Sequence, residues 1–220
     1  MRPMGGYLCK VYIRQTPSIL KALASHLTWN GPAVVNGKAA VYLTFDDGPH
    51  PEITVEVMRL LGEHGAKGVF FCVGENVQRH PEVVIQLRDE GHGIGNHTQR
   101  HESGWDASQF SYLKSYAQCQ ALLNAPWFRP PYGRITKGQA EALRAHTEIV
   151  MWDVLSADFD ERNSPESCLE HLMLDTRPGA IVVFHDSEKA APRMLPVLET
   201  YLRWLNEEGY ECHILPRQSS

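Results

Sequence analysis

The fold of this chain is decided by the stretch Ala40-Val41-Tyr42-Leu43-Thr44-Phe45-Asp46-Asp47-Gly48-Pro49. Its first five residues form an apolar run that predicts a buried strand. Two adjacent carboxylates therefore stand where the strand ends and the chain turns. Like charges raise each other's pKa, and burial penalises both charged forms. The pair is best explained if one acid binds a metal ion and the other handles a proton.

Length and composition indicate one globular domain. The chain has 220 residues, and the 43% that are hydrophobic suffice for one sizeable core. The net charge of −5 offers no basic surface, so we expect no nucleic-acid partner. No apolar run approaches the roughly 20 residues of a membrane span, and the first ten residues lack the apolar core of a secretory signal. We therefore expect a cytoplasmic protein, leave an extracytoplasmic location open, and make no prediction of the oligomeric state.

The cysteines favour a reducing compartment. They are odd in number, widely spaced and contain no Cys-x-x-Cys pair: Cys9, Cys72, Cys119, Cys168 and Cys212. This pattern is typical neither of a disulfide framework nor of a zinc knuckle.

From residue 38 onward, apolar runs alternate with helical patterns. The runs predict strands at 41–45, 68–73, 93–95, 127–128, 149–154, 181–185 and 212–215. The helical patterns lie at 51–64, 81–90, 108–123, 137–145, 165–175 and 192–208. Such alternation implies a parallel sheet, and seven strands indicate a distorted (β/α)7-type barrel, an α/β fold with parallel strands. We expect a single catalytic domain over 38–220, preceded by an N-terminal extension over 1–37.

Titratable residues gather where these strands end, which is where barrels of this kind carry their chemistry. His97 and His101 are spaced i, i+4, and on a helical turn both rings would share one face. Together with Asp47 they could hold one divalent metal and leave positions open for water and substrate. We favour zinc, and cobalt, nickel or iron(II) would suit the same ligands.

The second acid and a proline-rich segment complete one half of the predicted site. Asp46 would act as general base toward the attacking water. Arg129 opens a stiff Arg-Pro-Pro-Tyr-Gly segment and could orient Asp46 through a charge-assisted pair. The backbone N–H of Tyr132 could donate to a developing oxyanion.

His185 ends an apolar strand and is the candidate general acid, since imidazole titrates in the useful range. Asp158 could hold its other ring nitrogen. Asp186 competes for that role, and the sequence leaves the choice open.

These residues match a known pattern, because the chain resembles the polysaccharide deacetylases of carbohydrate esterase family 4 over about residues 38 to 216. The family's Thr-Phe-Asp-Asp-Gly motif corresponds to 44–48, its His-Ser/Thr-x-x-His motif to 97–101 and its Arg-Pro-Pro-Tyr motif to 129–132. The resemblance implies a distorted barrel and metal-dependent removal of N-acetyl groups from amino sugars. An N-acetylated carbohydrate would then be the substrate.

Carried over by position, the resemblance assigns the same roles as the residues do: Asp46 the base, Asp47, His97 and His101 the ligands, Arg129 the orienting group, the Tyr132 amide the oxyanion donor and His185 the acid. It further implies that Val183 lines the acetyl pocket. The family's Asp-x-x-Asp-Trp motif is altered, with Leu155 for the first Asp and Phe159 for the Trp. Asp158 survives to support His185, whereas Phe159 keeps an aromatic wall in the substrate site without the indole donor.

Two other functions fit the same residues. Relatives on this scaffold hydrolyse small non-sugar amides, and the lack of a visible secretion signal favours such a substrate. A barrel with an altered fourth motif could instead be a non-catalytic carbohydrate-binding relic, although the base, ligands and acid are all retained.

Overall fold

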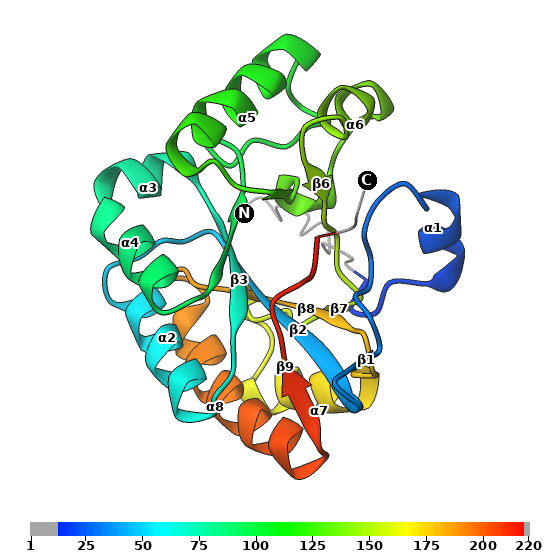
Figure 1. The fold of residues 1–220 in the computed structure, drawn as a ribbon, viewed down its shortest axis with the longest axis vertical. Helices are drawn as coiled ribbons and strands as arrows, with labels where there is room; N and C mark the ends of the chain where they lie inside the picture. The colour runs from blue at the N-terminus through cyan, green and yellow to red at the C-terminus, as the bar shows by residue number, and fades with distance from the viewer. Residues whose placement is uncertain (1–12, 218–220) are drawn as a thin grey trace, which may run out of the picture.

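The computed structural model describes residues 13–217, in which nine strands form one sheet that curls into an open barrel with helices around its outside (Figure 1). The strands are β1 (Val34–Val35), β2 (Lys38–Asp46), β3 (Gly68–Cys72), β4 (Gly93–Asn96), β5 (Trp127–Phe128), β6 (Glu148–Ile149), β7 (Val154–Leu155), β8 (Ile181–His185) and β9 (Tyr210–Cys212). The helices are α1 (Ser18–Leu23), α2 (Ile53–Glu63), α3 (Gly74–Arg79), α4 (Pro81–Asp89), α5 (Gln109–Leu123), η1 (Pro131–Gly133), α6 (Lys137–Leu143), α7 (Pro165–Asp175) and α8 (Ala191–Glu207).

The sheet is parallel along its main path, in the order β6-β5-β4-β3-β2-β8-β7. The central strand β2 also pairs through its first half with β9, in parallel, and with β1, antiparallel. This arrangement confirms the predicted α/β barrel in one domain. None of the described helices combines the length and apolar character needed to cross a membrane.

Strand β2 explains why the two acids lie at the barrel mouth. Its residues Leu43 and Phe45 pack outward into the large core beneath the surrounding helices, whereas Tyr42 packs into the smaller core inside the barrel. Because side chains alternate along a strand, Thr44 and Asp46 share the inward face with Tyr42. Asp46 therefore reaches the interior at the carboxyl end of the central strand.

Two predicted strands differ from the structure. The predicted strand 149–154 is wrong, because β6 and β7 are separated by residues 150–153. In that gap the carbonyls of Val150 and Met151 accept hydrogen bonds from the Arg129 guanidinium, so a side chain takes the place of a neighbouring strand. β9 ends before residues 213–215, and Ile214 and Leu215 pack into the inner core instead.

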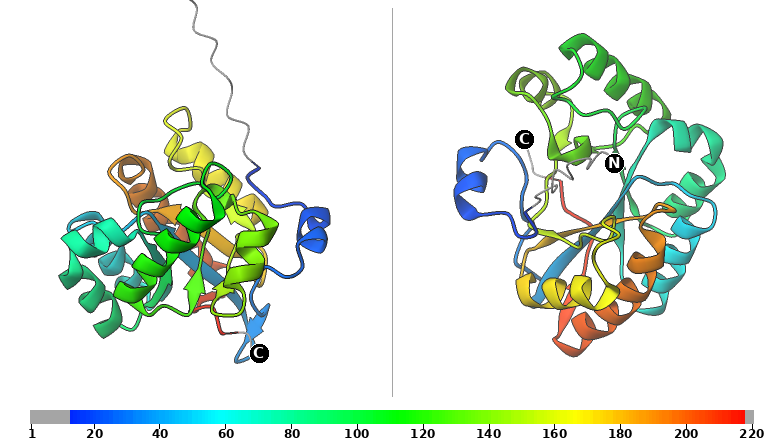
Figure 2. Two further views of the ribbon diagram at one scale, coloured as in Figure 1. Left: turned by 90° about the horizontal axis from the view of Figure 1, so that it is seen from above. Right: turned by 180° about the vertical axis from the view of Figure 1, so that it is seen from behind.

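The N-terminal segment 13–35 lies along the side of the barrel, with α1 standing apart from the other helices (Figure 2). Thr28 forms a parallel bridge with Val150, and Gln15 forms an antiparallel bridge with Val154. The Thr28 N–H also donates to the carbonyl of Ile149 in β6 at 2.9 Å, so the segment reaches both β6 and β7, the two ends of the strand order. The predicted division of the chain at residue 38 stays a prediction.

An ionic cluster holds this segment in place. The carboxylate of Asp153 is fully buried and is paired with Lys21 and Arg177. It also accepts a hydrogen bond of 3.0 Å from the Asn30 amide. Two of these three partners come from the N-terminal segment, and they offset the cost of burying the charge.

Candidate metal centre and active site

The predicted site residues meet at the carboxyl ends of the strands. Asp46 ends β2, and Asp47 follows it directly. His97 follows β4 and Arg129 follows β5, while His185 ends β8. Parallel strands deliver these residues to one rim although up to 139 positions separate them in the chain.

Asp47, His97 and His101 offer one ligand atom each, and these atoms all lie within 4.8 Å of one another. The Asp47 Oδ1 atom is 3.1 Å from His101 Nε2 and 3.8 Å from His97 Nε2. It is also buried without a hydrogen-bond partner among the described residues. A buried carboxylate oxygen without a donor is costly, and a cation shared with two imidazoles removes that cost. These three residues therefore fit a divalent metal.

The sequence predicts that a helical turn brings the two histidines together, and the structure has no helix there. Residues 97–101 form a loop, in which Thr98 and His101 have φ values of 64° and 58°. The Thr98 N–H donates to the Asn96 side chain at 2.8 Å, and its carbonyl accepts from Gly74 N–H at 2.9 Å. These bonds replace the helical pattern and still bring the imidazole rings of His97 and His101 to 5.0 Å.

His97 is prepared to act as a neutral ligand. Its Nδ1 lies 2.8 Å from the backbone carbonyl of Arg129, which can only accept, so Nδ1 carries the proton and the Nε2 lone pair is free. Burial lowers the pKa of His97 to about 4, despite the opposing charge of Asp46. Burial alone would raise the pKa of Asp47, yet the imidazoles of His101, His185 and His97 lower it. Both groups thus hold their metal-binding forms at neutral pH.

The second acid, Asp46, is held by a buried arginine. Arg129 is fully buried and donates to Asp46 Oδ1 at 2.7 Å and to the Thr44 hydroxyl at 2.8 Å. Its guanidinium carbon lies 4.1 Å from the centroid of the Phe71 ring. Burial lowers the pKa of Arg129, and the charge of Asp46 opposes that effect. Arg129 is therefore part of the barrel interior, and it fixes Asp46 with its Oδ2 atom 4.0 Å from His97 Nε2.

Asp158, and not Asp186, contacts the His185 imidazole in the structure. Asp158 is fully buried, and its two oxygens accept from His185 Nδ1 at 2.7 Å and from the His185 backbone N–H at 2.9 Å. Burial alone would lower the pKa of His185, but the charge and hydrogen bond of Asp158, helped by Asp47 and Asp46, raise it to about 9. The Phe159 ring meets the imidazole edge-on, with centroids 5.0 Å apart.

Asp186, the competing acid, has another role. Its carboxylate accepts from Gly48 N–H at 2.9 Å and from the hydroxyl of Thr54 on α2. Burial raises the pKa of Asp186 to about 8, and the Asp47 charge adds to this. Asp186 therefore fixes the turn that carries Asp47. Thr54 gives no signal in the sequence, whereas Thr44 could have been found from its place on the inward face of β2.

Two predicted substrate-binding residues differ in their exposure. The Tyr132 side chain is exposed at the rim, and its ring meets His101 edge-on with centroids 4.7 Å apart. Val183 is buried on the strand that ends in His185, two positions earlier and so on the same inward face.

The rim contains strained backbone. Left-handed φ values, which β-carbons disfavour, occur at Asp47 (84°), Thr98 (64°), His101 (58°), Tyr132 (59°) and Ala157 (59°). Each such residue costs on the order of 1–3 kcal/mol, and such residues cluster at functional sites. Here all five belong to the loops that carry the metal-ligand candidates, the Arg-Pro-Pro-Tyr segment and Asp158.

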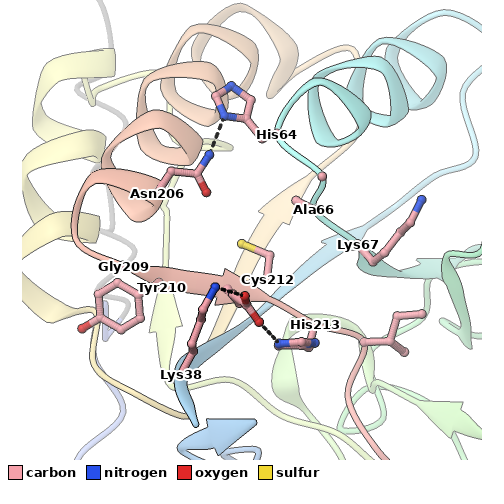
Figure 3. A pocket seen from close by; sticks show the side chains of 12 residues that line it. Lys38, His64, Ala66, Lys67, Asn206, Gly209, Tyr210, Cys212 and His213 are labelled. Carbon is pink, nitrogen blue, oxygen red and sulfur yellow. Dashed lines mark hydrogen bonds and ion pairs between the residues drawn. The ribbon is translucent and has the colours of Figure 1, made fainter. Parts of the chain in front are cut away.

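A pocket of about 750 Å³ lies at the opposite end of the strands, near the start of β2 and around β9 (Figure 3). Its polar groups largely pair with one another: Glu211 binds both Lys38 and His213, and Asn206 bonds to His64. None of the residues assembled at the carboxyl ends of the strands lines this pocket.

The chain is similar in sequence to proteins that are named deacetylases. A sequence model described as polysaccharide deacetylase matches residues 33–147, more than half of the chain. A peptidoglycan-N-acetylglucosamine deacetylase of Bacillus cereus is 33% identical over 178 residues, which cover 74% of this chain and 64% of that relative's length. A chitooligosaccharide deacetylase of Azorhizobium caulinodans is 30% identical, covering 70% of this chain and 76% of the relative.

Among solved structures, the Bc1960 peptidoglycan N-acetylglucosamine deacetylase, in complex with 4-naphthalen-1-yl-N-oxidanyl-benzamide, superposes with a TM-score of 0.82 at 28% identity. The match covers 91% of this chain and 95% of that one. A family model that matches more than half of the chain and a relative that is 33% identical over 74% of it show that this chain belongs to the polysaccharide deacetylase family.

Proposed function

We propose that this protein is a metal-dependent hydrolase that removes N-acetyl groups from an N-acetylated amino-sugar oligomer or polysaccharide. The observation that carries the proposal is the meeting of Asp47, His97 and His101 beside a second, arginine-held acid, Asp46. The relatives named as peptidoglycan and chitooligosaccharide deacetylases support the substrate class.

A divalent cation held by Asp47, His97 and His101 would polarise the acetyl carbonyl and lower the pKa of the attacking water. The ligand set of two imidazoles and one carboxylate with open positions favours zinc, and cobalt, nickel or iron(II) would suit the same donors.

The side chains around this centre divide the proton transfers between them. Asp46, held by Arg129, takes a proton from the attacking water. The Tyr132 backbone N–H donates to the oxyanion as the carbonyl carbon becomes tetrahedral. His185, kept protonated by Asp158, gives its proton to the departing amine nitrogen, which leaves free amine and acetate. Phe159 contacts His185, and Val183 stands two positions before it on the same face of β8. We expect these two side chains to contact the acetyl group and the sugar.

An assay of acetate release tests the proposal. Purified protein should release acetate from N-acetylglucosamine oligomers or peptidoglycan fragments, and a chelator should stop the reaction until the metal is restored. Turnover of small non-sugar amides without any turnover of sugars would instead identify the alternative hydrolase. Binding of oligomers without any acetate release would identify a carbohydrate-binding relic. The cytoplasmic location stays a prediction, to be tested by cell fractionation.

A further inference from the structure

A row of exposed side chains leads outward from the metal centre. It begins at the Tyr132 ring, which meets the His101 ring. The Arg134 guanidinium carbon lies 5.9 Å from the Tyr132 ring centroid and 5.2 Å from that of Trp105. Tyr132 and Trp105 are 61% and 64% exposed, and the Arg134 side chain is 47% exposed with its Nη1 atom 4.0 Å from Asp106 Oδ2. Tyr132, Arg134 and Trp105 thus form one open surface, which we call the ledge.

The ledge is held in place although it faces solvent. The Trp105 indole N–H donates to the backbone carbonyl of Ile135 at 3.3 Å. The neighbouring Gly104 N–H donates to the Arg134 carbonyl at 3.0 Å, and its own carbonyl accepts from the Gln139 amide at 2.9 Å. A β-carbon at Gly104 would lie 2.5 Å from both the Arg134 carbonyl oxygen and Gln139 Oε1, so only glycine allows this approach.

The same contacts join the ledge to a regular element. Gln139 also closes the capping box of α6, because its side chain accepts from Thr136 N–H while its N–H bonds to the Thr136 hydroxyl. The loop bearing Trp105 is therefore fixed to the first turn of α6. A surface ordered before binding loses little conformational entropy when a ligand settles on it.

The chemistry of the ledge matches a sugar ring. A pyranose presents an apolar face of C–H groups, which packs on an aromatic ring, and a rim of hydroxyl and acetamide oxygens. Arg134 offers several N–H donors for such oxygens beside the two aromatic faces. Large exposed aromatic side chains that gather around one cation next to a reaction centre are typical of a binding surface.

We infer that the ledge of Trp105, Arg134 and Tyr132 binds a second sugar ring, one that neighbours the sugar being deacetylated, and so makes the enzyme selective for oligomers. This inference rests on the proposed function and adds residues Trp105 and Arg134, which the reaction itself does not need. It assigns these two residues to affinity for longer oligomers and not to proton transfer.

The test compares Trp105→Ala, Trp105→Phe and Arg134→Gln with the native enzyme on N-acetylglucosamine monomer, dimer, tetramer and hexamer. We expect Trp105→Ala to lower kcat/KM for the tetramer and hexamer about tenfold, through KM, and to leave the monomer unchanged. Trp105→Phe should restore most of the loss, and Arg134→Gln should show a smaller loss with the same length dependence. Ile85→Ala, which truncates a side chain 60% exposed on α4, serves as the matched control. An equal loss on monomer and hexamer would mean that Trp105 only supports the loop, and would overturn the inference.

A binding measurement separates this inference from the proposed function. In an Asp46→Asn background, calorimetry with the hexamer should give a Kd about tenfold weaker when Trp105 is also changed to Ala. Equal affinity in both variants overturns the ledge even if the native enzyme deacetylates sugars. Acetate release from no sugar removes the proposed function, and the calorimetry then decides the ledge on its own.

Discussion

Two histidines of the site, the buried His97 and the partly buried His185, have pKa values that are shifted in opposite directions. His97 and His185 each bond through Nδ1, but the acceptor is a neutral backbone carbonyl for His97 and the Asp158 carboxylate for His185. Burial lowers the pKa of His97 to about 4, whereas Asp158 outweighs burial and raises the pKa of His185 to about 9.

The difference shows how one imidazole becomes a ligand and another an acid. A metal ligand needs a free lone pair on Nε2, and a general acid needs a proton there. The choice is made by the group behind each ring. When the surroundings of two titratable groups shift their pKa values in opposite directions, the shifts indicate which group acts as acid and which does not.

The largest expected effect comes from removing a side chain proposed to bind the metal, on the side of the site that contains His97. We expect His97→Ala or Asp47→Ala to lose stoichiometric metal and to lower kcat/KM roughly a thousandfold or more, since the metal supplies several kcal/mol of stabilisation. Elemental analysis and acetate release measure the two losses. His213→Ala, at the opposite end of the barrel, is the control and should retain both metal and activity. Full metal content in both ligand variants would remove the ligand assignment.

The next largest effect concerns Asp46, the acid that Arg129 holds beside the proposed metal ligands. Asp46→Asn keeps the shape but cannot accept a proton, so we expect kcat to fall by about 10²–10⁴ while metal content stays the same. Steady-state kinetics with parallel metal analysis checks this. Unchanged kcat would place the general base elsewhere.

A smaller effect concerns the pH dependence of activity that we expect from His185. With a pKa of about 9, His185 is protonated below that pH and loses its proton above it, so activity should fall on the alkaline side. A cation at Asp47 opposes part of this stabilisation, which places the alkaline limb at or below pH 9. Asp158→Asn removes the charge that raises the pKa, so the limb should move to lower pH and kcat at pH 8 should fall. A pH profile that does not move would contradict the acid role of His185.

The smallest effect concerns the ring beside the acid. Phe159→Leu removes the edge-on contact with His185, and such aromatic contacts contribute about 0.5–1.5 kcal/mol. We expect up to about a tenfold loss in kcat/KM with metal content unchanged. Phe159→Trp should retain activity, since it keeps the aromatic wall. A Phe159→Leu variant that loses metal would show that this ring also supports the proposed metal ligands.

Much of this arrangement could be predicted because parallel strands end at one rim. The apolar runs gave the barrel, and the polar residues after each run gave the neighbourhood of Asp47, His97 and His185. The support of His185 by Asp158 could not be separated from support by Asp186, because the distinction depends on how two loops fold back on β8.

Other features depend on contacts that leave no pattern in the sequence. At the break at residues 150–153, two backbone carbonyls accept hydrogen bonds from the guanidinium of Arg129, which lies some twenty positions earlier. The loop at 97–101 depends on bonds to Asn96 and Gly74. The bond from Thr54 to Asp186 joins residues 132 positions apart.

The N-terminal segment has a consequence for handling the protein. β6 and β7 end the strand order, and open strand edges tend to recruit other chains and aggregate. Thr28 and Gln15 occupy backbone groups at the two edges, so we expect these residues, which have no part in the reaction, to limit self-association. A shortened protein that begins at residue 38 would keep every residue of the site, yet we expect it to scatter light where the full chain stays monodisperse.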